Sequence, residues 1–205
     1  MTRKPLILIP VSKPPKTYLS ALEAVGVNSI CNFSPSELDK FSGLLLTGGG
    51  DILSSFYNCS ISCNSVNVLR DATEINLFKY FFEKNAPVLA ICRGMQMVNV
   101  CLGGTLKTVD GHQSPCKMDV DHNILPSNGI FKAFEKTNSN HKQCIDKLCS
   151  QAENVIYSHD GVIEGFTVKN TIAVQFHPER MDLNAIHLIY DEFAKRVNLY
   201  FDNSK

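Results

Sequence analysis

A cysteine, an arginine and a glycine follow one another at residues 92–94, directly after an apolar run. In one interpretation a strand turns sharply into a helix at Cys92, and small residues two places to either side, Ala90 and Gly94, relieve the crowding. Such a nucleophile elbow places the Arg93 N–H and the positive end of the next helix beside the sulfur, which favours a thiolate and a developing oxyanion. In the other interpretation, Cys92 is a buried thiol that fills the end of a strand.

A nucleophilic thiol needs a base to accept its proton, and the base needs a group that orients its ring. His177 lies in the sequence AVQFHPE, immediately after an apolar run, and Glu179 follows two residues later. These residues fit the roles of base and orienting carboxylate, with Pro178 stiffening the turn between them. The alternative is a histidine that only ends a strand, and the cysteine elbow elsewhere in the chain weighs against it.

The elements that would position these residues alternate in type along the first half of the chain. Strands are expected at residues 6–10, 28–33, 43–46 and 87–91, and helices at 18–25, 71–84 and 94–102. Alternation of strands and helices with short connections is typical of a parallel sheet covered by helices on both sides.

The last third of the chain has a different pattern of expected elements. Strands are expected at residues 154–158, 161–168 and 171–176, and a helix at 182–200, while residues 54–67 and 107–127 have no clear period and are expected to be loops. We therefore predict an α/β fold in a single domain over residues 1–205, with a mostly parallel central sheet flanked by helices and a small antiparallel section.

The composition limits the partners. The 20 basic residues balance the 20 acidic ones, which argues against a broad electrostatic surface for nucleic acid or anionic lipid. No run of about 18 apolar residues is present, so no membrane span is expected. The apolar run at the N-terminus is too short for a secretory signal, and the 8 cysteines are best explained as reduced thiols. We expect a cytoplasmic protein without nucleic-acid or membrane partners.

Two groups of residues have a spacing that resembles a metal site. They are Cys59 with Cys63, and His112 with Cys116 and His122. Neither is paired in the pattern of a structural zinc site. The sequence therefore predicts no metal and no cofactor.

Four ordered motifs resemble those of class I glutamine amidotransferases: LTGGG at residues 46–50, ICRGMQ at 91–96, NSNH at 138–141 and QFHPE at 175–179. They are most similar to the branch of free-standing γ-glutamyl hydrolases that act on γ-glutamyl-γ-aminobutyrate and related compounds. The segment RDATE at residues 70–74 also resembles that branch. The resemblance covers nearly the whole chain and implies a flavodoxin-like class I amidotransferase fold.

The resemblance also implies roles for individual residues. Cys92 would be the nucleophile, His177 the general base and then acid, and Glu179 the orienting carboxylate. An oxyanion would be held by the backbone N–H of Arg93 and by one from the glycine loop. The residues implied in substrate binding are Gly49, Gly50, Arg93, Gln96, Asn140 and His141, the last three holding the α-amino and α-carboxylate groups of a glutamyl moiety.

Simpler interpretations of these residues stay open. The glycine loop would be either a flexible loop or a loop that binds phosphate. The lack of a following Gly-Lys-Ser/Thr argues against a nucleotide site of the Walker type. Gln96 would be an ordinary polar residue of a helix, and Asn140 with His141 an ordinary turn. Asp71 and Glu74 would form a solvated helix start, favourable to the dipole there.

The implied activity is hydrolysis of a γ-glutamyl amide, which releases glutamate and an amine through a γ-glutamyl thioester. A phosphorylated or nucleotide-activated glutamine with a substituted amide nitrogen, as used for phosphoramidate decoration of bacterial surface sugars, is one substrate of this kind. The alternatives are a glutaminase subunit that delivers ammonia to a partner synthetase and a catalytically silent γ-glutamyl-binding module. Residues 51–67 and 107–127 depart from the family pattern, so the amine stays open.

Overall fold

The computed structural model describes residues 4–32, 36–114, 116 and 118–204. The strands of the central sheet are β1 (Leu6–Ile9), β2 (Asn28–Cys31), β3 (Gly43–Leu46), β4 (Val88–Ile91), β9 (Glu153–Tyr157), β10 (Ile163–Val168) and β11 (Thr171–Val174). They are ordered β2-β1-β3-β4-β11-β10-β9. The five from β2 to β11 are parallel, and β10 pairs antiparallel with both β11 and β9.

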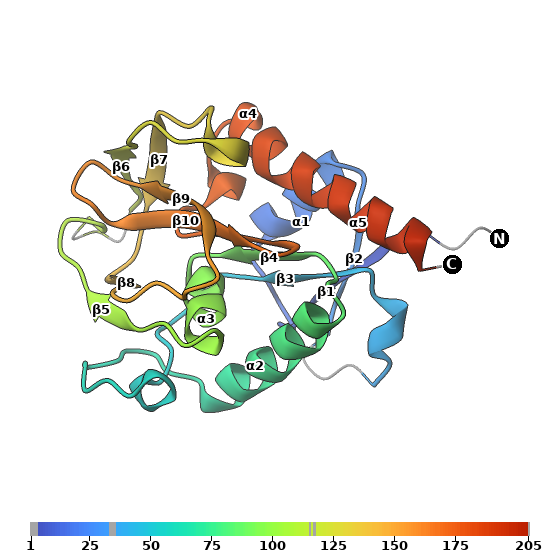
Figure 1. Ribbon diagram of the computed structural model, residues 1–205, viewed down its shortest axis with the longest axis horizontal. Helices are drawn as coiled ribbons and strands as arrows, with labels where there is room; N and C mark the ends of the chain where they lie inside the picture. Colours follow the sequence, from blue (N-terminus) through green and yellow to red (C-terminus); the bar gives the residue numbers. More distant parts are fainter. Residues whose placement is uncertain (1–3, 33–35, 115, 117, 205) are drawn as a thin grey trace.

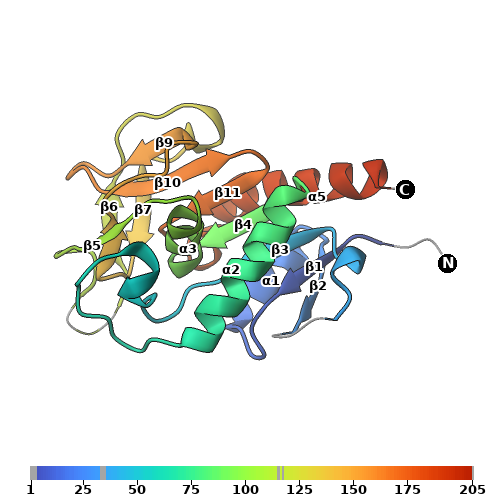
Figure 2. The same cartoon turned by 60° about the horizontal axis from the view of Figure 1, so that its bottom comes forward.

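Helices cover both faces of this sheet, which gives three layers (Figures 1 and 2). They are α1 (Lys16–Ala24), α2 (Val68–Glu83), α3 (Arg93–Cys101), α4 (Leu183–Ile186) and α5 (Glu192–Asn203). Neighbouring strand residues point to opposite faces. Ile7 and Ile9 therefore pack in the cluster that includes α1 and α5, and Leu8 packs in the one that includes α2 and α3. Because both faces are covered, the central strands are apolar throughout.

Most predicted elements are confirmed, with shifted ends. Helix α2 begins three residues before the predicted start at Asp71, and the Asn67 side chain caps it by accepting from the Arg70 N–H at 3.0 Å. The predicted helix 182–200 consists of α4, a π-helical segment (His187–Asp191) and α5. Residue 33 of the second predicted strand lies outside the described residues.

The prediction of a loop at residues 107–127 is wrong, because it contains part of β5 (Leu106–Thr108) and all of β6 (Val120–Asn123). Their partners β8 (Gln143–Ile145) and β7 (Lys136–Ser139) are also unpredicted. These strands are polar, as in VDHN and KTNS, and owe their conformation to pairing with distant segments. Residues 115 and 117 lie outside the described residues. The predicted loop 54–67 contains one 3₁₀ turn, Ser54–Tyr57.

The order of the parallel strands explains where reactive residues gather. Strands β3, β4 and β11 are neighbours and run in one direction. Their carboxyl ends therefore meet at one edge of the sheet, where ligands bind in folds of this type. The glycine loop follows β3, Cys92 follows β4, and His177 follows β11.

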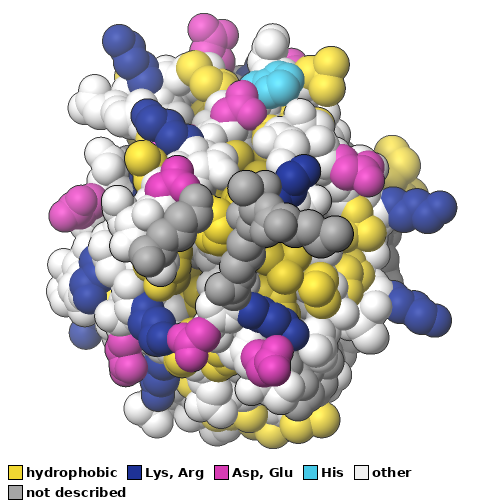
Figure 3. Space-filling view, turned by 90° about the vertical axis from the view of Figure 1, so that its right-hand side faces the viewer, with side chains coloured by type: hydrophobic (Ala, Val, Ile, Leu, Met, Phe, Trp, Pro, Cys, Tyr) yellow, Lys and Arg dark blue, Asp and Glu magenta, His cyan; other side chains and the backbone are white. Residues whose placement is uncertain are grey.

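The surface shown in Figure 3, at the end of the molecule where the termini lie, carries interspersed basic and acidic side chains. No helix within the described residues combines the length and apolar character that crossing a membrane requires.

Gly94 tests how tightly α3 packs on the sheet. A Cβ atom there would lie 2.4 Å from the Leu46 carbonyl oxygen, which belongs to the backbone of β3 and cannot rotate away. We expect Gly94→Ala to destabilise the protein by about 1–3 kcal/mol through overpacking, despite the gain of up to about 1 kcal/mol from helix propensity. Urea unfolding measures the change. Asn76→Ala, at an exposed position of α2, is the control, and its free energy of unfolding should stay within about 0.5 kcal/mol of the wild-type value. Equal stability of Gly94→Ala and the wild type would contradict tight packing of α3 on β3.

Candidate active site

Cys92 occupies a strained turn between β4 and α3. Its φ is 55° and its ψ is −108°, a backbone conformation that residues other than glycine rarely adopt and that costs of order 1–3 kcal/mol. The turn is held because the Cys92 N–H donates to the Val174 carbonyl at 2.7 Å, and the Cys92 carbonyl accepts the N–H of Gln96 at 3.2 Å. The elbow predicted from small neighbours and a following helix is therefore present.

His177 and Glu179 lie beside this elbow. The Nδ1 atom of His177 lies 2.7 Å from Oε1 of Glu179. Because a carboxylate only accepts, Nδ1 donates in this contact, and the other ring nitrogen is left for Cys92. Burial by itself lowers the pKa of His177, but the charge of Cys92, a hydrogen bond to it and the contact with Glu179 together raise that pKa to about 10. The arrangement therefore favours the protonated form of the His177 imidazole beside the sulfur of Cys92.

Asn138, on β7, fixes the backbone of His177. Its Oδ1 accepts the His177 N–H at 2.8 Å and its Nδ2 donates to the His177 carbonyl at 3.1 Å. The same Nδ2 donates to Asp119 at 3.1 Å, and Asp119 also accepts from Asn140 at 2.9 Å and from Arg180 at 3.0 Å. The sequence motif that contains Asn138 gave no indication of this role.

Tyr18, on α1, is a second residue that the sequence analysis missed. Its hydroxyl accepts the Gly48 N–H at 3.0 Å and lies 3.3 Å from His177 Nδ1. Burial and the charges of Glu179 and Cys92 raise the pKa of Tyr18, so it stays neutral. Because the Gly48 N–H is already used, Gly49 and Gly50 are the donors that the loop can offer to an oxyanion. No sequence signal marked this role, since a tyrosine on the apolar side of a helix is typical of a core residue.

Two buried carboxylates of α2 hold the side chain of Arg93. Asp71 and Glu74 are both 0% exposed, and each forms an ion pair with the Arg93 guanidinium. The alternative that these acids form a solvated helix start is therefore wrong. With its side chain turned to α2, Arg93 offers the cavity its backbone N–H.

Arg70 extends this network to the glycine loop. Its Nε donates to Glu74 at 2.7 Å, and its Nη2 donates to the carbonyls of Thr47 at 3.1 Å and Gly48 at 3.0 Å. A Cβ atom on Gly49 would lie 2.3 Å from Nη1 of Arg70, so only glycine allows this approach. The two arginines and two acids thus balance in charge and tie the elbow to the loop.

Cys92 lines a cavity of about 520 Å³ at this edge of the sheet. The structure brings all of the residues predicted to bind substrate to the wall of this cavity: Gly49, Gly50, Arg93, Gln96, Asn140 and His141. The divergent segments contribute Asp51, Asn64, Ser65 and Gln113 to the same wall.

Several wall residues are already engaged in protein contacts. Gln96 Nε2 donates to the Gln143 carbonyl at 2.8 Å and to Gln175 Oε1 at 3.1 Å, which leaves its carbonyl oxygen to offer to a ligand. Asn140 is held at both ends, since it donates to Asp119 and accepts from Gln113 at 2.5 Å. Its side chain therefore shapes the wall of the cavity.

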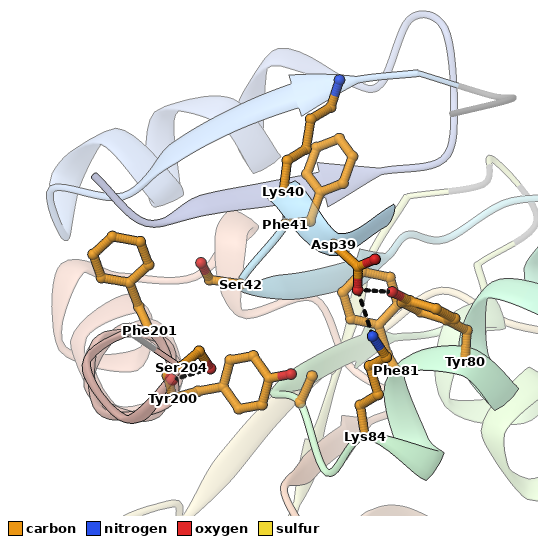
Figure 4. A pocket seen from close by; sticks show the side chains of 11 residues that line it. Asp39, Lys40, Phe41, Ser42, Tyr80, Phe81, Lys84, Tyr200, Phe201 and Ser204 are labelled. Atoms are coloured by element: carbon orange, nitrogen blue, oxygen red, sulfur yellow. Dashed lines mark hydrogen bonds and ion pairs between the residues drawn. The ribbon is translucent and has the colours of Figure 1, made fainter. Parts of the chain in front are cut away.

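A larger cavity, of about 750 Å³, lies at the opposite end of the sheet (Figure 4). The segment before β3 and the ends of α2 and α5 form it, and Asp39 there accepts from Tyr80 at 2.6 Å and from Lys84. Its described lining contains neither a cysteine nor a histidine, whereas the smaller cavity is lined by Cys92 and His141.

Comparison with known proteins agrees with this geometry. The model of the family Peptidase C26 matches residues 31–179. The chain belongs to the peptidase C26 family. This membership confirms the resemblance stated above and places the chain among glutamine amidotransferase-like hydrolases.

Two relatives illustrate the similarity. A Schizosaccharomyces pombe protein that is named after the glutamine amidotransferases is 32% identical over 171 residues, which cover 72% of this chain and 64% of the relative. This chain therefore matches less than two thirds of that relative's length. A γ-glutamyl-CDP-amidate hydrolase from Campylobacter jejuni is 31% identical over 156 residues, covering 74% of this chain and 69% of the relative.

Solved structures share the fold. A Thermoplasma acidophilum protein that is named after the GMP synthases superimposes with a TM-score of 0.74 at 20% identity, covering 99% of this chain and 98% of that one. A Thermotoga maritima glutamine amidotransferase gives 0.66 at 17% identity, covering 100% and 91%. The predicted α/β fold with a mostly parallel sheet is thus confirmed.

The buried network around Arg93 leads to a stability test. Glu74→Gln removes a charge that both Arg70 and Arg93 contact, and leaves a buried guanidinium short of a counter-ion. Breaking a buried pair in this way typically costs about 3–5 kcal/mol, which denaturant unfolding measures. Glu83→Gln, an exposed position on the same helix, is the control and should change the free energy of unfolding by less than about 0.5 kcal/mol. Equal effects of the two changes would show that the network contributes no net stability.

Proposed function

We propose that the chain hydrolyses the γ-glutamyl amide bond of an N-substituted glutamine derivative. The observation that carries the proposal is a thiol on a strained elbow at the wall of a cavity, hydrogen-bonded to a histidine that a buried carboxylate orients. Thiol, imidazole and carboxylate in this order form the arrangement of a nucleophile, a base and its orienting group. The family supports a hydrolase or amidotransferase of this kind.

In the proposed reaction the Cys92 thiolate attacks the δ-carbonyl carbon of the glutamyl group. The backbone N–H groups of Arg93 and of Gly49 or Gly50 donate to the oxyanion that forms. The carbon–nitrogen bond then breaks, the departing nitrogen takes a proton from His177, and a thioester remains. His177 next removes a proton from water, and the resulting hydroxide releases glutamate and restores the thiolate.

The glutamyl end of the substrate would bind along the wall near α3. The free carbonyl oxygen of Gln96 suits the α-ammonium group, which only donates hydrogen bonds. The segment formed by Asn140, His141 and Lys142 would face the α-carboxylate.

The amine half would lie against the divergent segments. Of their contributions to the cavity, Asn64, Ser65 and Gln113 are polar and uncharged, while Asp51 carries a carboxylate that accepts the Asn64 N–H at 2.7 Å. The neighbouring Lys142 adds a positive charge that offsets the negative one. A polar amine that bears phosphoryl groups fits such a wall, and the name of the Campylobacter jejuni relative, a γ-glutamyl-CDP-amidate hydrolase, supports the same class. We therefore place phosphorylated or nucleotide-activated glutamine derivatives first among the substrates to test.

Replacement of the thiol tests the thioester scheme. Cys92→Ala and Cys92→Ser should each lower the rate of glutamate release from γ-glutamyl amides by about 10⁴-fold or more. The reason is that a nucleophile, its base and the orienting carboxylate act as one unit, so loss of the nucleophile removes the contribution of all three. Enzyme-coupled detection of glutamate gives the rate, and circular dichroism verifies that the fold survives. Turnover retained in both variants would contradict covalent catalysis by Cys92.

A substrate comparison separates the proposal from its alternatives. The second candidate function is that of a glutaminase subunit that works with a synthetase. A relative from Sulfolobus acidocaldarius that is named as a carbamoyl phosphate synthase small chain, 27% identical over 189 residues, supports this candidate. We expect the isolated chain to hydrolyse N-substituted γ-glutamyl amides with a higher kcat/KM than glutamine. If glutamine is the only compound hydrolysed, and only when a synthetase is present, the result would favour this second candidate. Binding of γ-glutamyl compounds without any turnover would favour the silent module.

A further inference from the structure

Three buried side chains behind the cavity wall form a compact polar cluster. His112 precedes the β6–β7 pair, His141 lies between β7 and β8, and Glu164 lies on β10. They are 0%, 5% and 0% exposed, and each presents one metal-ligating atom within 4.8 Å of the other two. The Glu164 Oε1 atom lies 3.5 Å from His112 Nδ1 and 3.9 Å from His141 Nε2.

Some polar atoms of this cluster lack hydrogen-bond partners. His141 Nδ1 lies 2.9 Å from the Gln143 carbonyl oxygen, which can only accept, so Nδ1 carries a proton. In the neutral ring, Nε2 is then a lone pair that points toward a carboxylate. Within the described residues, this Nε2 and both oxygens of Glu164 have no hydrogen-bond partner. The third ligand atom, His112 Nδ1, is not among them, since it lies 3.1 Å from the Ser139 hydroxyl oxygen as well as 3.5 Å from Glu164 Oε1. His141 Nε2 and the Glu164 carboxylate therefore face each other inside the protein without a hydrogen bond, which is costly, and a positive charge between them would remove this cost.

The spacing of the three atoms suits a small divalent ion. A tetrahedral ion with bonds of about 2.0–2.1 Å separates its ligand atoms by about 3.3 Å. The separations from Glu164, 3.5 and 3.9 Å, exceed this value by about 0.2 and 0.6 Å, and the two histidine nitrogens lie within 4.8 Å of each other, so the three side chains would move closer together to bind the ion. Two imidazoles and one carboxylate also form a known zinc ligand set that leaves the fourth position open, and His141 belongs to the cavity wall as well.

We propose that His112, His141 and Glu164 bind a divalent transition-metal ion, with zinc as the first choice because imidazole and carboxylate ligands both suit it. The ion would neutralise Glu164 and fix the segment after β7 that forms part of the cavity wall. This proposal does not depend on the proposed hydrolase activity. It replaces the expectation of no metal, which considered only residues close in sequence and could not include Glu164.

A second set of potential ligands, His112, His122 and Asp160, is less suited to hold the ion. The Asp160 side chain is 51% exposed and already accepts from His112 Nε2 at 2.9 Å and from the Ser158 hydroxyl. Its hydrogen-bonding needs are met, whereas those of Glu164 are not. The other rival occupant of the buried set is a proton. A second proton on His141, or on His112 with its Nε2 already donating to Asp160, would pair with Glu164 without any metal.

Cobalt(II) is the probe that distinguishes these occupants. The full-length Cys92→Ser chain, freed of metal with a chelator, is titrated with cobalt and followed by its visible ligand-field absorption, so that the thiol of the elbow cannot compete. We expect saturation at one ion per chain and displacement of cobalt by zinc. Glu164→Gln should weaken binding by more than about 100-fold, beyond the effect of losing an outer partner of a ligand. Asp160→Asn is the matched control and should bind as the parent chain does.

Three outcomes would overturn the proposal. They are no saturable binding, loss of binding in Asp160→Asn but not in Glu164→Gln, and a spectrum dominated by sulfur-to-cobalt charge transfer, which would place the ion on cysteine. If Glu164→Gln does not fold, anomalous scattering from zinc-soaked crystals of the wild-type chain decides the matter. A peak bonded to the three side chains supports the site, and its absence overturns it.

Discussion

The parallel register between β4 and β11 is the constraint on which the site depends. Ile91 pairs with Val174, and the next N–H along β4, that of Cys92, donates to the Val174 carbonyl. This single ladder determines that a thiol and an imidazole from distant parts of the chain leave the sheet side by side. A slip of one residue would turn each of these side chains to the opposite face, so the buried apolar faces that set the register also set the chemistry.

The site contains several features that would each lower the stability of the protein if no neighbouring contact compensated for them. A non-glycine residue has a positive φ, a histidine whose pKa is raised by its neighbours is buried, and two carboxylates lie inside the protein. Each is offset locally. The elbow is held by the ladder and by α3, the histidine by Glu179 and by the side-chain amide of Asn138, and the carboxylates by two arginines. The same contacts that offset these costs leave the reactive groups little freedom to move.

The features that could be predicted from the sequence are those that a short segment determines by itself. Buried parallel strands must be apolar throughout, so LILI and VLAI identified β1 and β4, and an elbow needs small neighbours, which identified Cys92. Polar strands such as β6 and β7 could not be found because only their pairing with each other makes them strands. Tyr18, Arg70 and Asn138 were missed for the same reason, since their roles depend on partners that the fold alone brings near. A motif indicated the position of Asn140, but not that both ends of its amide are held by protein.

Asp119 shows a limit on how the wall of the cavity can vary. It lies in a segment that departs from the family pattern, yet its carboxylate accepts from Asn138, Asn140 and Arg180, which reach the backbone of His177, the cavity and the turn beside Glu179. Changes elsewhere in this segment are therefore free to reshape the wall, provided that one acidic side chain stays at the junction. An insertion that displaced this carboxylate would loosen the wall at Asn140 and the backbone around His177 at once.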